Sequence, residues 1–401
     1  MTVFGEYVYD NVIVFAPGAR DIKAISTDIL LEFLEHGGNL LVAVNEKVSD
    51  YMRSFIGQLG VEFDVKDSKV VDHFAFDTTL DKSLDHSTIQ LGEAALKSSV
   101  LSKFYTHSSP VLYKGIGHSF ESDNILVYPA LSGNPSTYSA IMHQDIKGYP
   151  ENVGTDTLLV SAIQGRNNAR IIVSGSIDMF SNEFFSSTIA STNKQSGNQL
   201  YCQALSKWGF GESGVLRFRD ITHTKEDGTP PDVILHEKER PDLPVSLYPD
   251  PEITRNSLVY RIKDMIVYTM IVEELVNDNW KPFVADDMQL EFVMLDPYVR
   301  RTMAVDEKTG KYSVCFMAPD SYGVYKFRVL YRRTGYSVLH AETTVSIRPF
   351  KHNEYERFII SAYPYYTSAF SAMIAFFSFF VVFLYSDFGK KDKTEKAKKT
   401  D

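Results

Sequence analysis

The chain has very little cysteine, and this limits the metal and thiol chemistry open to it. Its 401 residues include two cysteines, Cys202 and Cys315. No CxxC or comparable ligand spacing is present, so a structural zinc site has no support. Both cysteines are expected to be small, buried, apolar residues, and a disulfide between them stays open. Neither stands at a strand-to-helix elbow, so a cysteine nucleophile of the glutaminase type is not expected.

The folded part lacks basic clusters, and the chain also lacks phosphate-binding loops and glycosylation acceptors. With 41 Lys and Arg against 51 Asp and Glu, the formal net charge is −10, and no basic stripe runs through the folded part. Nucleic acid is therefore not an expected partner, because contacts to phosphates need clustered cations. Gly18 and Gly37-Gly38 form no phosphate-loop pattern, and Asn134-Pro135-Ser136 has proline in the position that an acceptor sequon excludes.

The N-terminus lacks a secretory signal. Met1 to Asp10 shows neither the basic start nor the apolar stretch that such a signal needs. Two interpretations remain: the sequence lacks its true start, or a later apolar segment serves as the signal. The first is preferred.

One long apolar run stands near the C-terminus. The 19 residues from Thr367 to Tyr385 carry no formal charge. As a helix this run would be about 28 Å long, which matches the hydrocarbon core of a thin bilayer. No polar face is visible, so a buried helix of a soluble protein is the less favoured alternative. The sequence predicts a transmembrane helix over residues 367–386. Tyrosines flank it where membrane meets water: Tyr363, Tyr365, Tyr366 and Tyr385.

A short tail, residues 387–401, follows the apolar run. Its six lysines favour the cytosolic side of the membrane. Lys398 and Lys399 stand fourth and third from the end and resemble the di-lysine signal that returns type I membrane proteins to the endoplasmic reticulum (ER). A solvated charge run is the alternative. The predicted location is the ER membrane, with a single span, the bulk of the chain in the lumen and the C-terminus in the cytosol.

The N-terminal half alternates short apolar runs with helical stripes. Residues 11–15 and 39–44 are predicted to be strands buried on both faces, and residues 22–34 and 51–59 to be helices. Gly37-Gly38 should end the first helix. Further strands of the same buried character are expected over residues 157–162 and 170–174. This order predicts an α/β domain over residues 1–214, incomplete at its N-terminus, with a parallel sheet covered by helices.

Beyond residue 214 the pattern changes. Residues 215–256 contain a Pro- and acid-rich stretch and are interpreted as a linker region. A β-rich domain over residues 257–350 and a juxtamembrane segment over residues 351–366 follow. Turns at Tyr322-Gly323 and Thr334-Gly335 separate a series of strand-like runs, which is typical of a β-sandwich. These runs are residues 265–275, 288–295, 311–317, 325–331 and 342–348.

Few residues are candidates for chemistry. Metal-dependent transfer needs clustered carboxylates, and the nearest groups are Asp72-His73 with Asp77, and Asp286-Asp287. Solvated acids at strand ends and in loops are the favoured interpretation, so no catalytic, cofactor or metal residue is assigned. Arg166 and Arg170 could hold a phosphate or carboxylate ligand. A turn with ion pairs is their alternative.

Motifs in the same order along nearly the whole chain resemble one family. They are Val12-Ile13-Val14-Phe15-Ala16-Pro17, Leu40-Leu41-Val42-Ala43, Gly165-Arg166-Asn167-Asn168-Ala169-Arg170, Ser174-Gly175-Ser176, Gln289-Leu290-Glu291-Phe292 and Tyr355-Glu356-Arg357-Phe358. In these motifs the chain is similar to the family of the 48-kDa subunit of oligosaccharyltransferase, from about Tyr9 to the end of the apolar run. Family members begin with a signal and a further strand–helix unit, which this sequence does not show, and its Pro-rich stretch is longer.

The resemblance implies both a fold and a role. The fold would be an α/β domain like that of class I glutamine amidotransferases, then β-rich domains and one anchor. The complex transfers an oligosaccharide from dolichyl diphosphate to Asn in Asn-X-Ser/Thr, and its catalytic site lies on another, polytopic subunit. This chain would be a non-catalytic scaffold without a cofactor. Its partners would be the other subunits, the ER membrane and a nascent chain or glycan.

Two other classes of function stay open. One is a self-sufficient, membrane-tethered hydrolase or amidotransferase-like enzyme of the ER lumen, for which Asp72 and His73 would be the first residues to change. The other is a lumenal cargo or adhesion receptor, suggested by the sandwich pattern and the single anchor. The retrieval-like tail argues against the receptor, because a receptor would be expected to leave the ER.

Overall fold

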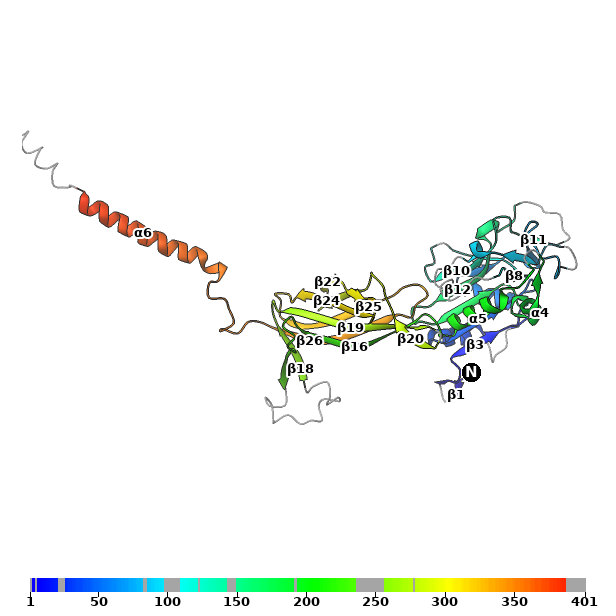
Figure 1. Ribbon diagram of the computed structural model, residues 1–401, viewed down its shortest axis with the longest axis horizontal. Coiled ribbons are helices and arrows are strands. Elements are labelled where there is room, and N and C mark those ends of the chain that lie inside the picture. Colours follow the sequence, from blue (N-terminus) through cyan, green and yellow to red (C-terminus); the bar gives the residue numbers. More distant parts are fainter. Residues whose placement is uncertain are drawn as a thin grey trace, which may run out of the picture. The chain divides into compact units, whose positions relative to one another are not determined.

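The computed structural model describes residues 2–3, 6–20, 26–81, 85–96, 109–121, 123–142, 149–190, 193–235, 256–276 and 278–386. Its packing divides the chain into two units, which are described in turn. The first comprises Met1–Pro231, Met265–Met317 and Tyr325–Val345, and the second comprises Asp232–Asp264, Ala318–Val324 and Ser346–Asp401. The fold is mixed α/β with several sheets and one long C-terminal helix (Figure 1).

A seven-stranded sheet forms the α/β part of the first unit. Its main path runs β3-β4-β13-β12-β9-β5, and β10 pairs with β12. The strands are β3 (Asn11–Val14), β4 (Asn39–Ala43), β5 (Val61–Phe63), β9 (His118–Phe120), β10 (Val127–Ser132), β12 (Leu158–Gln164) and β13 (Arg170–Ser174). Helices α1 (Thr27–Glu35), α2 (Asp50–Gln58) and α5 (Asn198–Gly209) accompany it.

Smaller elements complete this part. They are the strands β1 (Thr2–Val3), β2 (Glu6–Tyr7), β6 (Ser68–Val71), β7 (Ile89–Leu91), β8 (Val111–Tyr113), β11 (Tyr138–Ile141), β14 (Thr188–Ile189) and β15 (Lys194–Gln195), with the short helix α4 (Asn182–Ser186). The helix starts follow their caps, because Ser26 and Ser49 each accept a hydrogen bond from a first-turn amide. Gly37 takes a left-handed φ of +90° just after α1, as predicted.

The central strands of the sheet are buried on both faces. On one face Leu40 and Val42 of β4 belong to a core with α1 and α2. On the other face Leu41 and Ile172 belong to a core with α5, which includes Trp208. This confirms the prediction for β4 and β13. It is wrong for β3, whose side chains alternate between exposed and half-buried; among the described strands β3 pairs with β4 alone.

The sheet is mixed, so the prediction of a parallel sheet is wrong in part. β3, β4 and β13 run parallel, whereas β12 runs antiparallel to β13, β9 and β10. The reason is the connection between β12 and β13, residues 165–169. This loop is closed by the Gly165 amide, which donates to the Ala169 carbonyl over 2.8 Å, with Asn168 at φ +70°. So short a turn joins antiparallel neighbours, because a parallel crossover needs a dozen residues or more.

Two sheets make up the β-rich part. The first has the order β16-β19-β24-β23, with β20 also on β19, and the second contains β26-β25-β21-β22. Their strands are β16 (Val215–Lys225), β19 (Met265–Val276), β20 (Asn279–Pro282), β21 (Gln289–Val293), β22 (Pro297–Thr302), β23 (Ala304–Asp306), β24 (Lys311–Met317), β25 (Gly323–Tyr331) and β26 (Leu339–Arg348). Rings from the two sheets pack together, with Phe292 5.3 Å from Phe316 and Tyr268 5.2 Å from Phe327.

The predicted linker region contains strands. Residues 215–225 form β16, which pairs with β19 along its length, with a register shift at Asp220. In the second unit β17 (Asp232–Leu235) pairs with β18 (Asn256–Arg261), and β18 lies parallel to the end of β26. Residues 236–255, the Pro-rich centre of the linker, lie outside the described residues. β16 escaped prediction because its polar and apolar residues do not alternate regularly.

One buried histidine predicts acid sensitivity of the α/β part. His118 on β9 is fully buried, and its Nε2 lies 2.7 Å from the Ser161 hydroxyl of β12. Burial lowers the pKa of His118 to about 3. The folded state therefore keeps the ring neutral while the unfolded chain takes up a proton below about pH 6.5. Stability should fall as the pH drops through that window, by about 2 kcal/mol at pH 5.

Hydrogen exchange of the β12 amides at pH 7 and pH 5 measures this loss. His118→Gln, which does not titrate, should remove most of the pH dependence. His352→Gln, at an exposed histidine, is the matched control and should leave it intact. Identical pH dependence in all three proteins would contradict the assignment to His118.

Candidate membrane-anchoring site

The C-terminal helix α6 (Tyr363–Tyr385) is 23 residues long and starts four residues before the predicted span. Pro364 lies in its first turn, where a missing amide hydrogen costs nothing. The segment Ile360–Tyr385 is long and apolar enough to cross a membrane, and none of its most apolar stretch is buried inside the protein. Apolar side chains point outward all round the helix. A helix of this kind is stable where lipid or other membrane helices surround it.

Aromatic residues mark both ends of α6. Tyr363, Tyr365 and Tyr366 are exposed in its first turn, and Tyr385 is exposed at its last residue. Tyrosine prefers the membrane–water interface, because its ring is apolar and its hydroxyl is wet. The positions agree with a span whose hydrocarbon part begins near Thr367.

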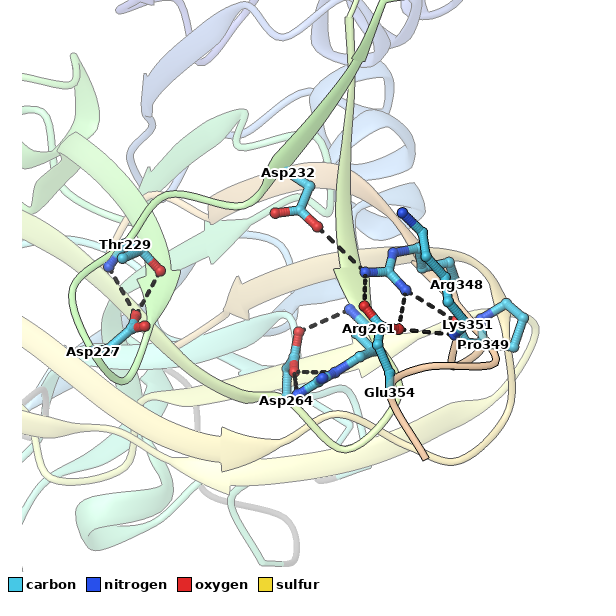
Figure 2. Close-up of polar contacts among 9 residues, drawn as sticks. All are labelled: Asp227, Thr229, Asp232, Arg261, Asp264, Arg348, Pro349, Lys351 and Glu354. Atoms are coloured by element: carbon cyan, nitrogen blue, oxygen red, sulfur yellow. Dashed lines mark hydrogen bonds and ion pairs between the residues drawn. The ribbon is translucent and has the colours of Figure 1, made fainter. Parts of the chain in front are cut away.

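The chain leaves β26 through an ion-paired turn that we call the juxtamembrane clamp: Arg348, Asp232, Lys351 and Glu354. In Figure 2 the Arg348 guanidinium lies between the carboxylates of Asp232 and Glu354. The two Arg348 Nη atoms donate to the two Glu354 carboxylate oxygens over 2.7 and 2.8 Å. The Lys351 amide donates to the same carboxylate over 2.8 Å, and Asp232 of β17 lies 3.6 Å from Arg348. The paired, fork-like geometry fixes direction as well as distance.

A second contact set braces the same turn. The Arg261 amide and guanidinium donate to the Asp264 carboxylate over 2.9 and 3.0 Å (Figure 2). The Arg261 guanidinium also lies over the Phe350 ring, 5.2 Å from its centre, and Phe350 meets Tyr355 edge to face at 5.3 Å. Within the second unit, β18 and the residues that follow β26 are therefore held together by both charge and ring contacts.

The clamp should be insensitive to pH near neutrality and sensitive to loss of one charge. Hydrogen bonds from Arg348 and the Lys351 amide lower the pKa of Glu354 to about 2. The contribution of Glu354 to stability is thus complete above the ordinary glutamate pKa of 4.5 and is lost as the pH falls from there towards 2. At pH 7, Glu354→Gln should make the amides of residues 351–355 exchange several-fold faster, because the charge-assisted fork is lost.

Glu356→Gln is the matched control, since Glu356 is exposed two residues away. Its exchange pattern should equal that of the unchanged chain. Equal exchange in the Glu354 variant would mean that the clamp does not hold the turn.

Of the two predicted ligand-binding arginines, Arg170 is occupied inside the protein. Only 2 % of it is exposed, and its guanidinium donates to the carbonyls of Trp208, Ser213 and Gly214 over 2.6–2.8 Å. Burial lowers the pKa of Arg170 to about 10. Arg166 is exposed in the turn before β13. The structure therefore favours a structural role for Arg170, and ligand binding by the pair stays a prediction.

Asp72 is a buried hub rather than a solvated loop acid. Its carboxylate accepts hydrogen bonds from the Phe74 and Ala75 amides and from Asn134 and Ser136, at 2.9–3.1 Å. Burial acts to raise the pKa of Asp72, but these hydrogen bonds outweigh it, so the pKa lies below the ordinary value. The expectation of a solvated acid is wrong here. The Asn134-Pro135-Ser136 segment supplies two of these donors, the Asn134 side-chain amide and the Ser136 hydroxyl.

The other candidates are dispersed. His73 is exposed and lies 2.6 Å from a ring nitrogen of His86 and 2.7 Å from the Tyr138 hydroxyl, while Asp77 is buried and binds Thr79. Asp287 pairs with Arg333 over 2.5 Å. Among the residues that the structure describes, no three His, Cys, Asp or Glu side chains are grouped so as to hold a metal ion.

The two cysteines are free and differ in environment. Cys202 of α5 is buried, and burial raises the pKa of its thiol. Cys315 of β24 is exposed, so the prediction that both are buried is wrong for this residue. Cys315 lies on the outward face of β24, next to the buried Phe316, and its apolar neighbours in sequence do not reveal that orientation. Lys398 and Lys399 lie outside the described residues.

Comparison with known proteins decides the family. A family model described as "OST48, N-terminal domain" matches residues 1–212, and one described as "OST48 middle domain" matches residues 249–387. The chain belongs to the OST48 family.

Three relatives of the OST48 family match over most of both chains, and each is named a dolichyl-diphosphooligosaccharide–protein glycosyltransferase 48 kDa subunit. The protein from Drosophila melanogaster is 39% identical over 396 residues, covering 96% of this chain and 82% of the relative. The Danio rerio protein is 39% identical over 391 residues, covering 95% and 82%. The Arabidopsis thaliana protein is 35% identical over 394 residues, covering 95% and 83%.

The OST48 middle-domain match includes Arg261, Arg348, Glu354 and α6, but sequence reasoning missed the clamp. Arg348 and Glu354 stand six residues apart, on either side of Pro349. In the sequence, this arrangement cannot be distinguished from two solvated charges. Another member of the clamp, Asp232, comes from β17, which is distant in sequence. The one available signal was a charge pair placed directly between a strand and a membrane span.

Proposed function

We propose that this OST48-family chain is a non-catalytic, membrane-anchored scaffold subunit of an oligosaccharyltransferase complex in the ER membrane. The observation that carries the proposal is collinear similarity, at 35–39% identity over most of the chain, to proteins named as the 48 kDa subunit of that glycosyltransferase. The subunit would help the complex transfer dolichol-linked oligosaccharide to Asn of Asn-X-Ser/Thr. Its partners would be the other subunits, including a polytopic catalytic one, and a nascent chain or glycan.

Features of the chain support a scaffold more than an enzyme. Asp72, one of the first candidates for chemistry, has its carboxylate surrounded by internal donors, and Arg170 binds carbonyls of its own chain. The fold proposal, an α/β domain of the class I glutamine amidotransferase type, is supported by a sheet with helices on both faces. A membrane anchor such as α6, which follows the clamp in the second unit, suits a protein that positions others.

Affinity purification from ER membranes in mild detergent tests the proposal. The tagged full chain should recover a polytopic transferase and glycan-transfer activity with it. Asp72→Asn should leave the specific transfer activity of whatever complex is recovered unchanged. Recovery of the chain alone, or a hydrolase activity abolished by Asp72→Asn or His73→Gln, would favour the membrane-tethered enzyme instead.

The proposed orientation places the bulk of the chain in the lumen and the tail in the cytosol. If Lys398 and Lys399 form a retrieval signal there, replacing both by serine should weaken ER retention of a reporter that carries α6 and the tail. Later-compartment processing of glycans on the reporter measures the escape. A matched reporter with Lys390 and Lys391 replaced by serine keeps the same charge loss and should stay in the ER. Equal retention of both would count against the signal.

A further inference from the structure

Between the clamp and α6 lies an eight-residue segment, 355–362, that we call the juxtamembrane strap. Its apolar side chains are consecutive and exposed: Phe358 by 60%, Ile359 by 47% and Ile360 by 75%. Tyr355 is exposed as well, and the Arg357 guanidinium lies 5.7 Å from the centre of the Phe358 ring. Three neighbouring large apolar residues left in water are unfavourable, so this surface is expected to have an occupant.

The length of α6 places the strap next to the membrane surface. Its 23 residues extend about 35 Å, whereas an ER hydrocarbon core of about 27–30 Å needs only 18–20 of them. The uncharged residues from Thr367 to Tyr385 fill that core. The first turn of α6, Tyr363 to Tyr366, then lies among the lipid headgroups, and the strap precedes it directly.

The strap is also tethered at its other end. Glu354, the residue before it, is held by Arg348 at the end of β26. Its last three residues, Ile360–Ala362, form a short 3-10 turn that runs directly into α6. The strap therefore cannot carry Phe358 and Ile360 far from the headgroup layer in which α6 begins.

We propose that the strap lies in the lipid–water interface on the proposed lumenal side. Phe358 and Ile360 insert at the boundary between headgroups and acyl chains, and Arg357 binds lipid phosphates. The occupant of the surface is lipid because the strap continues directly from a membrane-crossing helix and its composition, aromatic and aliphatic residues beside an arginine, is that of interfacial segments. The inference rests on the proposed membrane anchoring by α6 and adds a second, in-plane contact to it.

Spin-label accessibility in the full chain tests this placement. The chain carries Cys315→Ser, retains the buried Cys202, and is reconstituted in phosphatidylcholine nanodiscs. Nitroxides are attached at Phe358→Cys and, in a separate protein, at Ile360→Cys. Reference labels are Lys308→Cys in an exposed turn and Phe376→Cys in the middle of α6. The readout is the ratio of collisions with oxygen, which enters lipid, to collisions with a water-soluble nickel chelate.

Positions 358 and 360 should give a ratio on the order of threefold above that of position 308 and below that of position 376. A ratio equal to that of position 308, with position 376 high, would place the strap in water and overturn the inference alone. Low collision rates with both reagents would show that protein covers the strap, which also overturns it. A ratio at position 376 as low as at 308 would overturn the anchoring by α6 together with the inference.

Discussion

Replacing Arg170 by methionine should destabilise the α/β part by about 2–4 kcal/mol. Methionine retains most of the side-chain volume but donates no hydrogen bond. The buried carbonyls of Trp208, Ser213 and Gly214 then lose the guanidinium that donates to all three. The stacking of the guanidinium on Trp208, 5.0 Å from the ring centre, is lost too. The destabilisation should appear in hydrogen exchange of β13 and α5, and as a lower melting temperature.

Arg166→Met is the matched control, because Arg166 is exposed in the turn directly before β13. Its effect on stability should stay within about 0.5 kcal/mol. If Arg170→Met leaves stability unchanged while either variant weakens binding of a phosphate or carboxylate ligand, the arginines act as a ligand site and the structural assignment is wrong.

Two arginines in the centre of α6 should remove the chain from the membrane. Ile374→Arg combined with Phe377→Arg places two charges near the bilayer midplane, at a cost of about 5–7 kcal/mol on insertion scales. The fraction of chain that resists extraction with alkaline carbonate should fall by more than tenfold. The same substitutions should abolish co-purification of a polytopic transferase.

The matched control for α6 is Ile374→Leu combined with Phe377→Leu, which keeps the apolar character. It should remain in the carbonate-resistant fraction. Full membrane retention of the arginine variant would mean that α6 does not lie in lipid as a single span, or that partner helices shield it.

Several features of the fold could be predicted because they depend on neighbours in sequence. The strand–helix–strand order around Gly37, the series of strands after Met265 and the apolar helix before Asp387 all follow from local hydrophobic pattern and turn residues. The strand partners could not be predicted in the same way. β12 and β13 were expected in a parallel sheet, and their five-residue connection makes them antiparallel.

The candidate site also has one part that could be predicted from neighbours in sequence and one part that could not. The uncharged run and its flanking tyrosines were visible in the sequence, whereas the clamp was not, because Asp232 meets Arg348 only after β17, β18 and β26 have paired. From the sequence, Asp72 was expected to be a solvated acid and Arg170 was a candidate for binding a phosphate or carboxylate ligand. The fold surrounds them with internal partners instead, and a residue's partners across a core leave no trace in its own sequence neighbourhood.

The sequence by itself determined that this chain has an α/β part, a β-rich part and one apolar helix able to span a bilayer, because each depends on periodicity and length within one segment. Tertiary structure decided which groups are free to act. Burial and hydrogen bonding depend on residues brought together from distant segments, so only the folded chain could assign Arg170 to the interior and Glu354 to the turn that leads into α6.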